Sequence, residues 1–419
     1  MVTMLRRVTA DYPLLLVTLA LSLFGVAMVY SAGQTDVSVG YVATAYRRQA
    51  AWLVAALIAA YVISRSPVRL IEWSATPMYI VAVILLVLVM LFGSGAGTAA
   101  SMKGWLTIGG VRIGQPGELA KIAVVLMLAK VLSQRRDPVR SLFDLWQPAL
   151  IVGVPWVLIM LQPDLGTGIV FVGIFFAMLF WAGVPWPLLL LLASPAVSLV
   201  LAFNTGAWGV WFLLLVGLVF WMRPYLVEGV LVVVANVVMG VVAPLLWERL
   251  QPYQQKRLLV FLDPSIDPQR SGYHVIQSQV AIGSGGLFGK GFTDGSQKRL
   301  AFLPAQHTDF IFAVVGEELG FIGVTIALAL FLALFLRCIR VATRGNDAFA
   351  SLVAFGIAST WFVHVIENVG MTLSLMPVTG IPLPFFSYGG SFMLVSWMAV
   401  GVLLALSAEG RGRADELLR

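Results

Sequence analysis

Apolar stretches close to the length of a membrane-spanning helix recur along this chain, and they restrict its fold more than any motif does. Hydrophobic residues make up 60% of the sequence and charged residues only 11%. In lipid, a chain satisfies its own backbone hydrogen bonds only as a helix or a closed barrel, and a run of about 20 apolar residues is typical of a helix. The sequence therefore predicts an all-α, polytopic membrane protein with a single transmembrane domain over residues 1–419.

Twelve apolar runs stand out when hydropathy is averaged over about nineteen residues. They cover residues 12–30, 49–63, 77–92, 118–132, 146–161, 168–181, 187–203, 208–221, 226–246, 310–336, 348–369 and 385–406. We therefore expect about 12 transmembrane helices, of which the first is retained as a span and is not a cleaved signal peptide. The single cysteine, Cys338, excludes an internal disulfide.

Arginines in the short connections predict the orientation of the bundle. They fall on one side, at Arg6, Arg7, Arg65, Arg69, Arg135, Arg136, Arg140, Arg223, Arg337, Arg340, Arg344, Arg411 and Arg413. Because positive charge accumulates in cytoplasmic loops, we expect this side and both termini to face the cytoplasm. The opposite, extracytoplasmic side then holds the loop around Trp105, the turn around Asp164, a long loop over residues 247–309 and the segment 370–384. These four pieces are expected to form one external site.

The long loop over residues 247–309 is basic, which indicates an anionic ligand outside the membrane. Its segment 281–296 reads AIGSGGLFGKGFTDGS, so that glycines surround Lys290. Such a backbone can turn its amides toward an anion such as a diphosphate. It is not a nucleotide-binding P-loop, because Gly291 follows the lysine where that motif has serine or threonine. A flexible connector is the alternative interpretation.

Asp309 follows His307 and Thr308 where the long loop returns to the membrane. A carboxylate at this partly dehydrated boundary suits a general base, and capping of the helix expected from residue 310 is the alternative. Glu317 and Glu318 lie two to three turns deeper in the apolar run, where carboxylates are costly and function is the first hypothesis. They are expected to be an ion-paired structural element, a relay or a surface for a partner.

Four further positions each have a functional and a structural interpretation. Glu118 and Lys121 share one helix face at i, i+3 spacing, so that a local ion pair with the lysine reaching to the interface is the alternative to ligand binding. Trp105, which follows the second outer cation Lys103, also fits an aromatic belt at the membrane surface. Asp164 fits the N-cap of the next helix better than it fits a catalytic role.

Other classes of chemistry have little support in the sequence. The three histidines, His274, His307 and His364, lack metal-ligand spacing, and no Gly-x-Ser-x-Gly or dinucleotide-binding fingerprint occurs in a suitable context. The formal charge of +7 is explained by the loops that flank the spans, so that no nucleic-acid partner is expected.

Together, several motifs resemble those of the SEDS proteins (shape, elongation, division and sporulation) along nearly the whole chain. They are QPDLGT at 162–167, FLP at 302–304, HTDFIFA at 307–313, GEELG at 316–320, PVTGIPLPF at 377–385 and SYGGS at 387–391. The loop sequences FLDP at 261–264, GYH at 272–274, AIGSGG at 281–286 and GKG at 289–291 are more similar to the RodA subgroup than to the FtsW subgroup.

The resemblance implies a peptidoglycan glycosyltransferase that polymerises lipid II into glycan strands at the outer face of a bacterial cytoplasmic membrane. It implies a class B penicillin-binding protein and the elongation or division machinery as partners, besides membrane lipids. Asp309 matches the family's essential loop aspartate, which is expected to deprotonate the 4-hydroxyl of the acceptor N-acetylglucosamine. This hydroxyl then attacks the anomeric carbon of the donor N-acetylmuramic acid with inversion, and undecaprenyl diphosphate leaves.

The resemblance also assigns supporting positions. Lysines at 103, 121 and 290, or a divalent cation such as Mg²⁺ or Mn²⁺, are expected to offset the charge of the diphosphate. Trp105 matches a tryptophan of the family. The full set of expected substrate-binding residues is Lys121, Glu118, Lys103, Trp105, Lys290, His307 and Ser387, and Asp164, Glu317 and Glu318 are expected to support them.

The chain departs from the family pattern in three ways. Gly117 stands where the family has serine, and Ala305 where it has glutamate. The family has a core of ten spans, so that the extra runs predict an inserted helix pair over residues 187–223, with a partner or lipid surface as its hypothetical role.

Two other functions fit part of the sequence. A transporter that flips the lipid-linked precursor would also need intramembrane carboxylates and a broken segment such as residues 370–384, but no inverted repeat is detectable. A non-catalytic scaffold for a penicillin-binding protein would leave Asp309 without a role.

Overall fold

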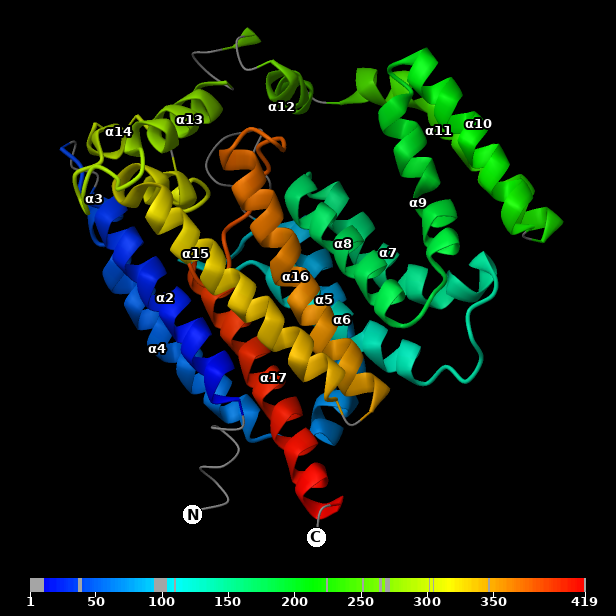
Figure 1. The fold of residues 1–419 in the computed structure, drawn as a ribbon, viewed down its shortest axis with the longest axis horizontal. Coiled ribbons are helices and arrows are strands. Elements are labelled where there is room, and N and C mark those ends of the chain that lie inside the picture. The colour runs from blue at the N-terminus through cyan, green and yellow to red at the C-terminus, as the bar shows by residue number, and fades with distance from the viewer. Residues whose placement is uncertain are drawn as a thin grey trace.

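The computed structural model describes residues 11–36, 40–93, 104–108, 111–223, 225–250, 252–263, 266–267, 272–300, 302–303, 305–345 and 347–417 (Figure 1). Every predicted apolar run corresponds to a helix. These helices are α2 (Tyr12–Ala32), α4 (Ala45–Ser64), α5 (Val68–Phe92), α6 (Pro116–Ser133), α7 (Trp146–Leu161), α8 (Leu165–Trp181), α9 (Trp186–Leu201), α10 (Thr205–Met222), α11 (Leu226–Arg249), α15 (Ile311–Thr343), α16 (Ala348–Thr372) and α17 (Gly390–Leu417). The prediction of a helical membrane protein is confirmed.

Fewer of the described helices meet the length and hydropathy of a membrane span than there are apolar runs in the sequence. Among the described residues, eight helices are long and apolar enough to cross a bilayer, and α8 and α9 are shorter apolar helices. The helices α4 and α6 contain charged side chains, such as Arg48 and Lys121. Twelve crossings therefore stay a prediction.

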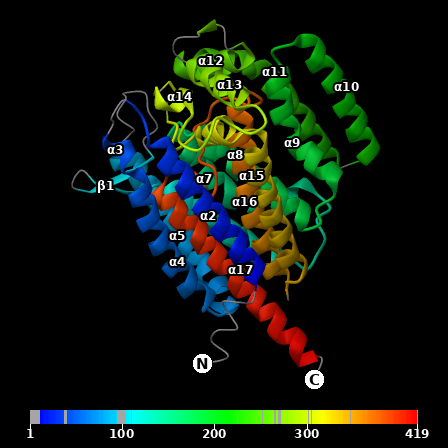
Figure 2. The same ribbon diagram turned by 60° about the vertical axis from the view of Figure 1, so that its left-hand side comes forward.

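Helix α16 lies at the centre of the bundle. It packs against α6, α8 and α15, while α17 packs against α4 and α15 against α2 (Figures 1 and 2). Among the eight candidate spans, α16 and α17 are the most buried. Polar side chains on these helices can therefore face protein instead of lipid. Helix α2 begins, and α17 ends, at the end of the bundle opposite α13 (Figure 1).

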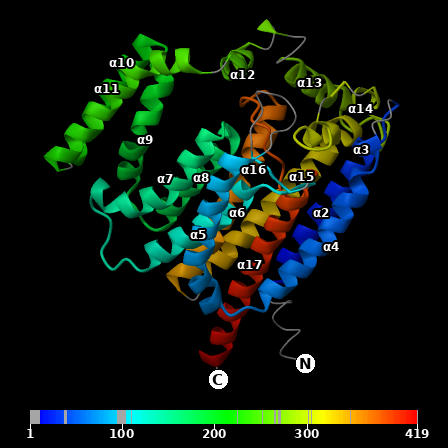
Figure 3. The same ribbon diagram turned by 180° about the vertical axis from the view of Figure 1, so that it is seen from behind.

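Helices α9, α10 and α11 form a group beside this bundle, next to α8 (Figures 1 and 3). A hydrogen-bond network joins them. Asn236 donates to Ser194 Oγ over 2.8 Å, Ser198 donates to Asn236 Oδ1 over 2.6 Å, and Trp211 donates to Ser198 Oγ over 3.1 Å. These bonds satisfy polar groups inside an apolar setting, and thereby tie the predicted inserted pair, residues 187–223, to α11.

The long loop contains more helix than its composition predicts. It holds α12 (Pro252–Leu262), α13 (Tyr273–Gly285) and α14 (Ser296–Arg299), and α13 packs against α15 at one end of the bundle (Figure 1). Two other short helices lie in connections, α3 (Gly40–Ala43) and a 3₁₀ turn (Leu142–Leu145).

A small β-hairpin was not predicted. Strands β1 (Leu106–Ile108) and β2 (Val111–Gly114) pair antiparallel, with Ile108 opposite Val111. The signal is present in the sequence, because two glycines separate two short runs of alternating apolar residues. The hairpin leads into α6 at Pro116, whose fixed φ suits the first position of a helix.

Candidate active site

Asp309 lies in the turn before α15 and faces the irregular segment 373–389 that connects α16 with α17. Its Oδ2 is 3.3 Å from the place that a Cβ on Gly380 would occupy, and Gly380 has a φ of +78°. Phe310 is the N-cap residue of α15, and its own side chain makes no capping hydrogen bond. The half-buried carboxylate of Asp309 is directed to the segment around residue 380, and the helix-capping alternative stays a prediction.

Asn368 on α16 fixes the backbone on both sides of this contact. Its Nδ2 donates to the carbonyl oxygens of Asp309, over 2.9 Å, and of Ile381, over 2.7 Å. The side chain is fully buried, so that loss of this amide would leave two carbonyl groups without their donor. We did not predict Asn368 as a site residue, although an amide within an apolar run is a recognisable signal.

Ser387 also connects the turn before α15 to the segment between α16 and α17. Its Oγ donates to the Thr308 carbonyl over 2.7 Å and accepts from the Leu383 amide over 2.8 Å. Gln49 on α4 supports it, because its Nε2 donates to the Ser387 carbonyl over 3.0 Å. Ser387 thus lies next to the backbone of the turn that contains Asp309, and its hydroxyl is hydrogen-bonded to the backbone. Its predicted contact with substrate stays a prediction.

His307 is half-buried at the rim of this contact. Its ring centroid is 5.6 Å from that of Tyr388, whose amide donates to the His307 carbonyl over 2.9 Å. Burial lowers the pKa of His307, and the nearby charge of Arg48 lowers it further. The imidazole is therefore neutral at pH 7 and can both donate and accept a hydrogen bond.

The second part of the site is a buried lysine on α6. Lys121 Nζ is 2.8 Å from Glu118 Oε2, which confirms the predicted ion pair, and also 2.8 Å from His364 Nε2. Both members of the pair are at most 3% exposed, so that the expectation that the lysine reaches to the interface is wrong. His364 was considered only as a metal ligand in the sequence, and its role as partner of Lys121 was missed.

His364 connects this lysine to the segment that Asp309 faces. Its Nδ1 lies 3.0 Å from the Pro382 carbonyl oxygen, which can only accept, so that Nδ1 carries the proton and Nε2 accepts from the ammonium of Lys121. Since Asn368 binds the adjacent Ile381 carbonyl, one chain of contacts runs from Lys121 to Asp309.

Two more carboxylates, Asp164 and Glu367, interact electrostatically with this cluster. Asp164 caps α8, as predicted, by accepting the Thr167 amide over 3.0 Å, and it interacts electrostatically with Glu118 and Glu367. Glu367, which the sequence analysis missed, is fully buried beside Thr379. Among the described residues, no three His, Cys, Asp or Glu side chains are placed to hold a metal ion. The expected divalent cation stays a prediction.

Glu317 and Glu318 form ion pairs with the long loop, which selects the structural element among their three predicted roles. Glu317 Oε1 is 3.0 Å from Lys290 Nζ, and Glu318 Oε1 is 2.6 Å from Lys298 Nζ. Both carboxylates are fully buried. Ser31 on α2 also donates to Glu318 over 2.7 Å, so that this cluster joins α2, α14 and α15.

The glycine-rich segment packs on the backbone of α15, where that helix is interrupted at Gly320. The amides of Lys290 and Gly291 donate over 3.0 Å to the carbonyl oxygens of residues 317 and 318. A Cβ on Gly289 would lie 2.0 Å from one of these oxygens. The interpretation as a flexible connector is therefore wrong, and these two amides bind the protein itself. Whether Lys290 binds a diphosphate stays a prediction.

Two predicted residues precede α6. Trp105 is half-buried directly before β1. Lys103 lies outside the described residues.

The fold and the site define a class of protein: a membrane protein built as a bundle of helices, with a cluster of acidic, lysine and histidine side chains at one end. The FtsW/RodA/SpoVE cell cycle protein family matches residues 12–208 and 189–412. The peptidoglycan glycosyltransferase MrdB of Escherichia coli K12 is 36% identical, over 96% of this chain and 94% of that protein. The peptidoglycan glycosyltransferase RodA of Treponema pallidum is 35% identical, over 95% and 98%.

Solved structures give the same result. A chain of a peptidoglycan synthase complex that coordinates polymerization and crosslinking is 28% identical, with a TM-score of 0.69 over 96% of this chain and 98% of that one. RodA of Thermus thermophilus, also 28% identical, has a TM-score of 0.62 over 96% and 97%. The chain belongs to the FtsW/RodA/SpoVE family, in agreement with the resemblance found in the sequence.

Proposed function

We propose that this protein is a RodA-like peptidoglycan glycosyltransferase that polymerises lipid II for cell elongation and shape, with Asp309 as the general base. The observation that carries the proposal is the placement of the Asp309 carboxylate against Gly380, in a segment that Asn368 and His364 connect to Lys121. The names of the relatives support the reaction class.

In the proposed reaction, Asp309 accepts the proton of the acceptor 4-hydroxyl as that oxygen bonds to the anomeric carbon of the donor. The bond between this carbon and the phosphate oxygen breaks, undecaprenyl diphosphate leaves, and the configuration of the anomeric carbon is inverted. General bases typically contribute 10²- to 10⁴-fold to rate. Since Asn368 and Ser387 hold the backbone of residues 308–309, they position the base without touching substrate.

Lys121 has a more indirect role in this mechanism. Its ammonium contacts Glu118 and His364 and its side chain is 2% exposed, so that a diphosphate oxygen reaches it only after this packing opens. In the resting arrangement the lysine instead fixes His364 and, through it, the Pro382 carbonyl. A divalent cation is the alternative source of charge for the leaving group.

The proposed location is the bacterial cytoplasmic membrane, with both termini in the cytoplasm and Asp309 outside. Two observations support this orientation. Arginines are concentrated in the short connections of one side. Helix α2 begins, and α17 ends, at the same end of the bundle. A class B penicillin-binding protein is the proposed partner, which the match to a chain of a peptidoglycan synthase complex supports.

The test is reconstitution of the full chain in vesicles with lipid II and a partner whose transpeptidase is inactive. Glycan polymer and lipid II translocation are measured in the same vesicles. Polymer that depends on this chain supports the proposal. Translocation without polymer would favour the flippase, and neither product, with the partner still bound, would favour the scaffold.

A further inference from the structure

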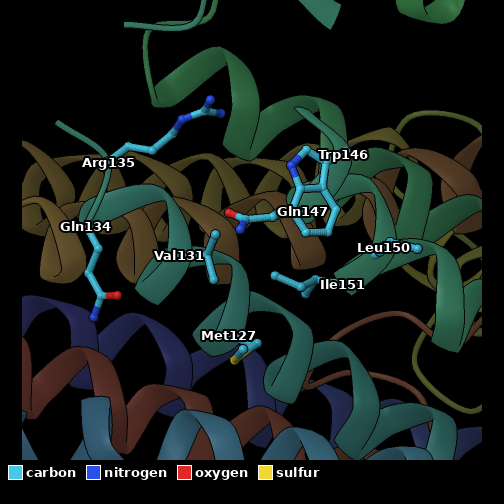
Figure 4. Close-up of a pocket in the computed structure, with 8 residues that line it drawn as sticks. All are labelled: Met127, Val131, Gln134, Arg135, Trp146, Gln147, Leu150 and Ile151. Atoms are coloured by element: carbon cyan, nitrogen blue, oxygen red, sulfur yellow. The ribbon is translucent and has the colours of Figure 1, made fainter. Parts of the chain in front are cut away.

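A groove lies at the end of the bundle opposite Asp309, between the last turns of α6 and the first turns of α7. It has a volume of ≈ 480 Å³ and is open to the surroundings of the protein. Its lining residues are Met127, Val131, Gln134, Arg135, Trp146, Gln147, Leu150 and Ile151 (Figure 4). None of them belongs to the cluster around Lys121, which lies near the other end of α6.

The groove is polar at one side and apolar at the other. Figure 4 shows Arg135 and Gln134 on the side away from Leu150, with Gln147 between them. Aliphatic carbon from Met127 and Ile151 completes the apolar part. An amphiphile with one polar head and an apolar chain matches this distribution, whereas a small soluble anion would leave the apolar part uncovered.

The connection at the polar side has three arginines and two aspartates, Asp137 and Asp144, so that its net charge is positive, and Arg135 is held in place. Arg135 donates to the Asp144 carbonyl and lies 3.6 Å from the Asp144 carboxylate, yet 27% of the arginine stays exposed. Arg136 and Arg140 are exposed in the same connection. Trp146 is 60% exposed at the mouth, as is typical of tryptophan at the level of lipid headgroups.

We infer that this groove binds an anionic phospholipid, with the phosphodiester at Arg135 and Gln147 and an acyl chain along Ile151 and Leu150. Basic pockets between membrane helices commonly bind anionic headgroups, and attraction to each arginine near such a surface increases affinity about fivefold. Glycosyl transfer is not involved, so that the inference holds or fails independently of the proposed function.

The test is native mass spectrometry of the delipidated full chain in neutral detergent, titrated with phosphatidylglycerol or with phosphatidylcholine of the same chains. We expect Arg135→Gln to weaken phosphatidylglycerol binding about fivefold and to leave phosphatidylcholine binding unchanged. Arg340→Gln is the matched control, because this exposed arginine lies on α15 and does not line the groove. Val131→Trp fills the groove without changing charge, and should weaken the binding of phosphatidylglycerol even if Arg135→Gln does not fold.

Glycerol phosphate distinguishes a lipid site from a site for free phosphate. We expect it not to displace phosphatidylglycerol. The inference is overturned if glycerol phosphate competes fully, if both lipids bind equally, or if both groove variants bind like the wild type.

Discussion

Replacement of Lys298 by methionine removes one half of an ion pair beneath the extramembrane helices. Lys298 Nζ is 2.6 Å from Glu318 Oε1, and both side chains are fully buried. Burial lowers the pKa of Lys298, while the hydrogen bond to Glu318 opposes this shift. Loss of one partner of a buried pair typically costs about 3–5 kcal/mol, because the other charge loses its compensation. Since Ser31 still donates to Glu318, we expect about 3 kcal/mol.

The assay is hydrogen exchange of residues 273–300 followed by mass spectrometry. A cost of about 3 kcal/mol corresponds to roughly a hundredfold increase in local opening, and hence in the exchange of protected amides. Lys256→Met is the control. Lys256 Nζ lies 3.9 Å from Asp267 Oδ2, and about half of the lysine side chain is exposed. Such an exposed ion pair stabilises the fold by at most about 1 kcal/mol.

A double variant tests the physical reason. Lys298→Met with Glu318→Leu removes both charges, and we expect slower exchange than in Lys298→Met alone. Wild-type exchange in Lys298→Met would refute the reasoning, and so would faster exchange in the double variant than in either single one.

Three further outcomes follow from the geometry. Burial holds the pKa of His307 in the folded protein below its unfolded value of 6.5. The neutral imidazole therefore contributes stability above pH 6.5, and this contribution is lost as the pH falls from 6.5 through the folded pKa. We expect the thermal unfolding temperature to fall over this pH range, and to fall less in His307→Gln. Asn368→Ala should slow polymerisation about tenfold or more by misplacing Asp309 while the protein stays folded, which paired rate and melting measurements check. Gly289→Ala places a Cβ against a backbone oxygen at φ +79° and should lower thermal stability by about 1–3 kcal/mol, whereas Gly283→Ala, with open space at its Cβ, should not.

Much of the helical architecture was predictable, because it depends on local hydropathy. Most apolar runs predicted the helix boundaries within about four residues, but α5 begins nine residues before its run, and α15 and α17 end seven and eleven residues after theirs. Asp164 was predicted as a helix cap from its position alone. The break in α15 was not predictable in this way. Gly320 adopts a φ of +63°, and its neighbours at 321 and 322 donate to carbonyl oxygens of residues 286 and 287, which lie far back in the chain.

Only the part of the site that depends on spacing along one helix was predictable from the sequence. The sequence indicated that Lys121 and Glu118 share a helix face, but not that His364 lies against them, because this contact depends on the packing of α16 on α6. Asn368 and Glu367 are visible as polar residues in an apolar run, yet their partners come from the irregular segment after α16.

The rate of glycan polymerisation by Asp309→Asn, with lipid II and a transpeptidase-inactive partner, tests the central proposal most directly. This substitution keeps the shape of the side chain and removes its capacity to accept a proton. We expect the rate to fall about 10²- to 10⁴-fold, with thermal unfolding unchanged. Asp267→Asn, in the same loop and paired with Lys256, should polymerise at the wild-type rate. A wild-type rate in folded Asp309→Asn would contradict the assignment of Asp309 as the general base.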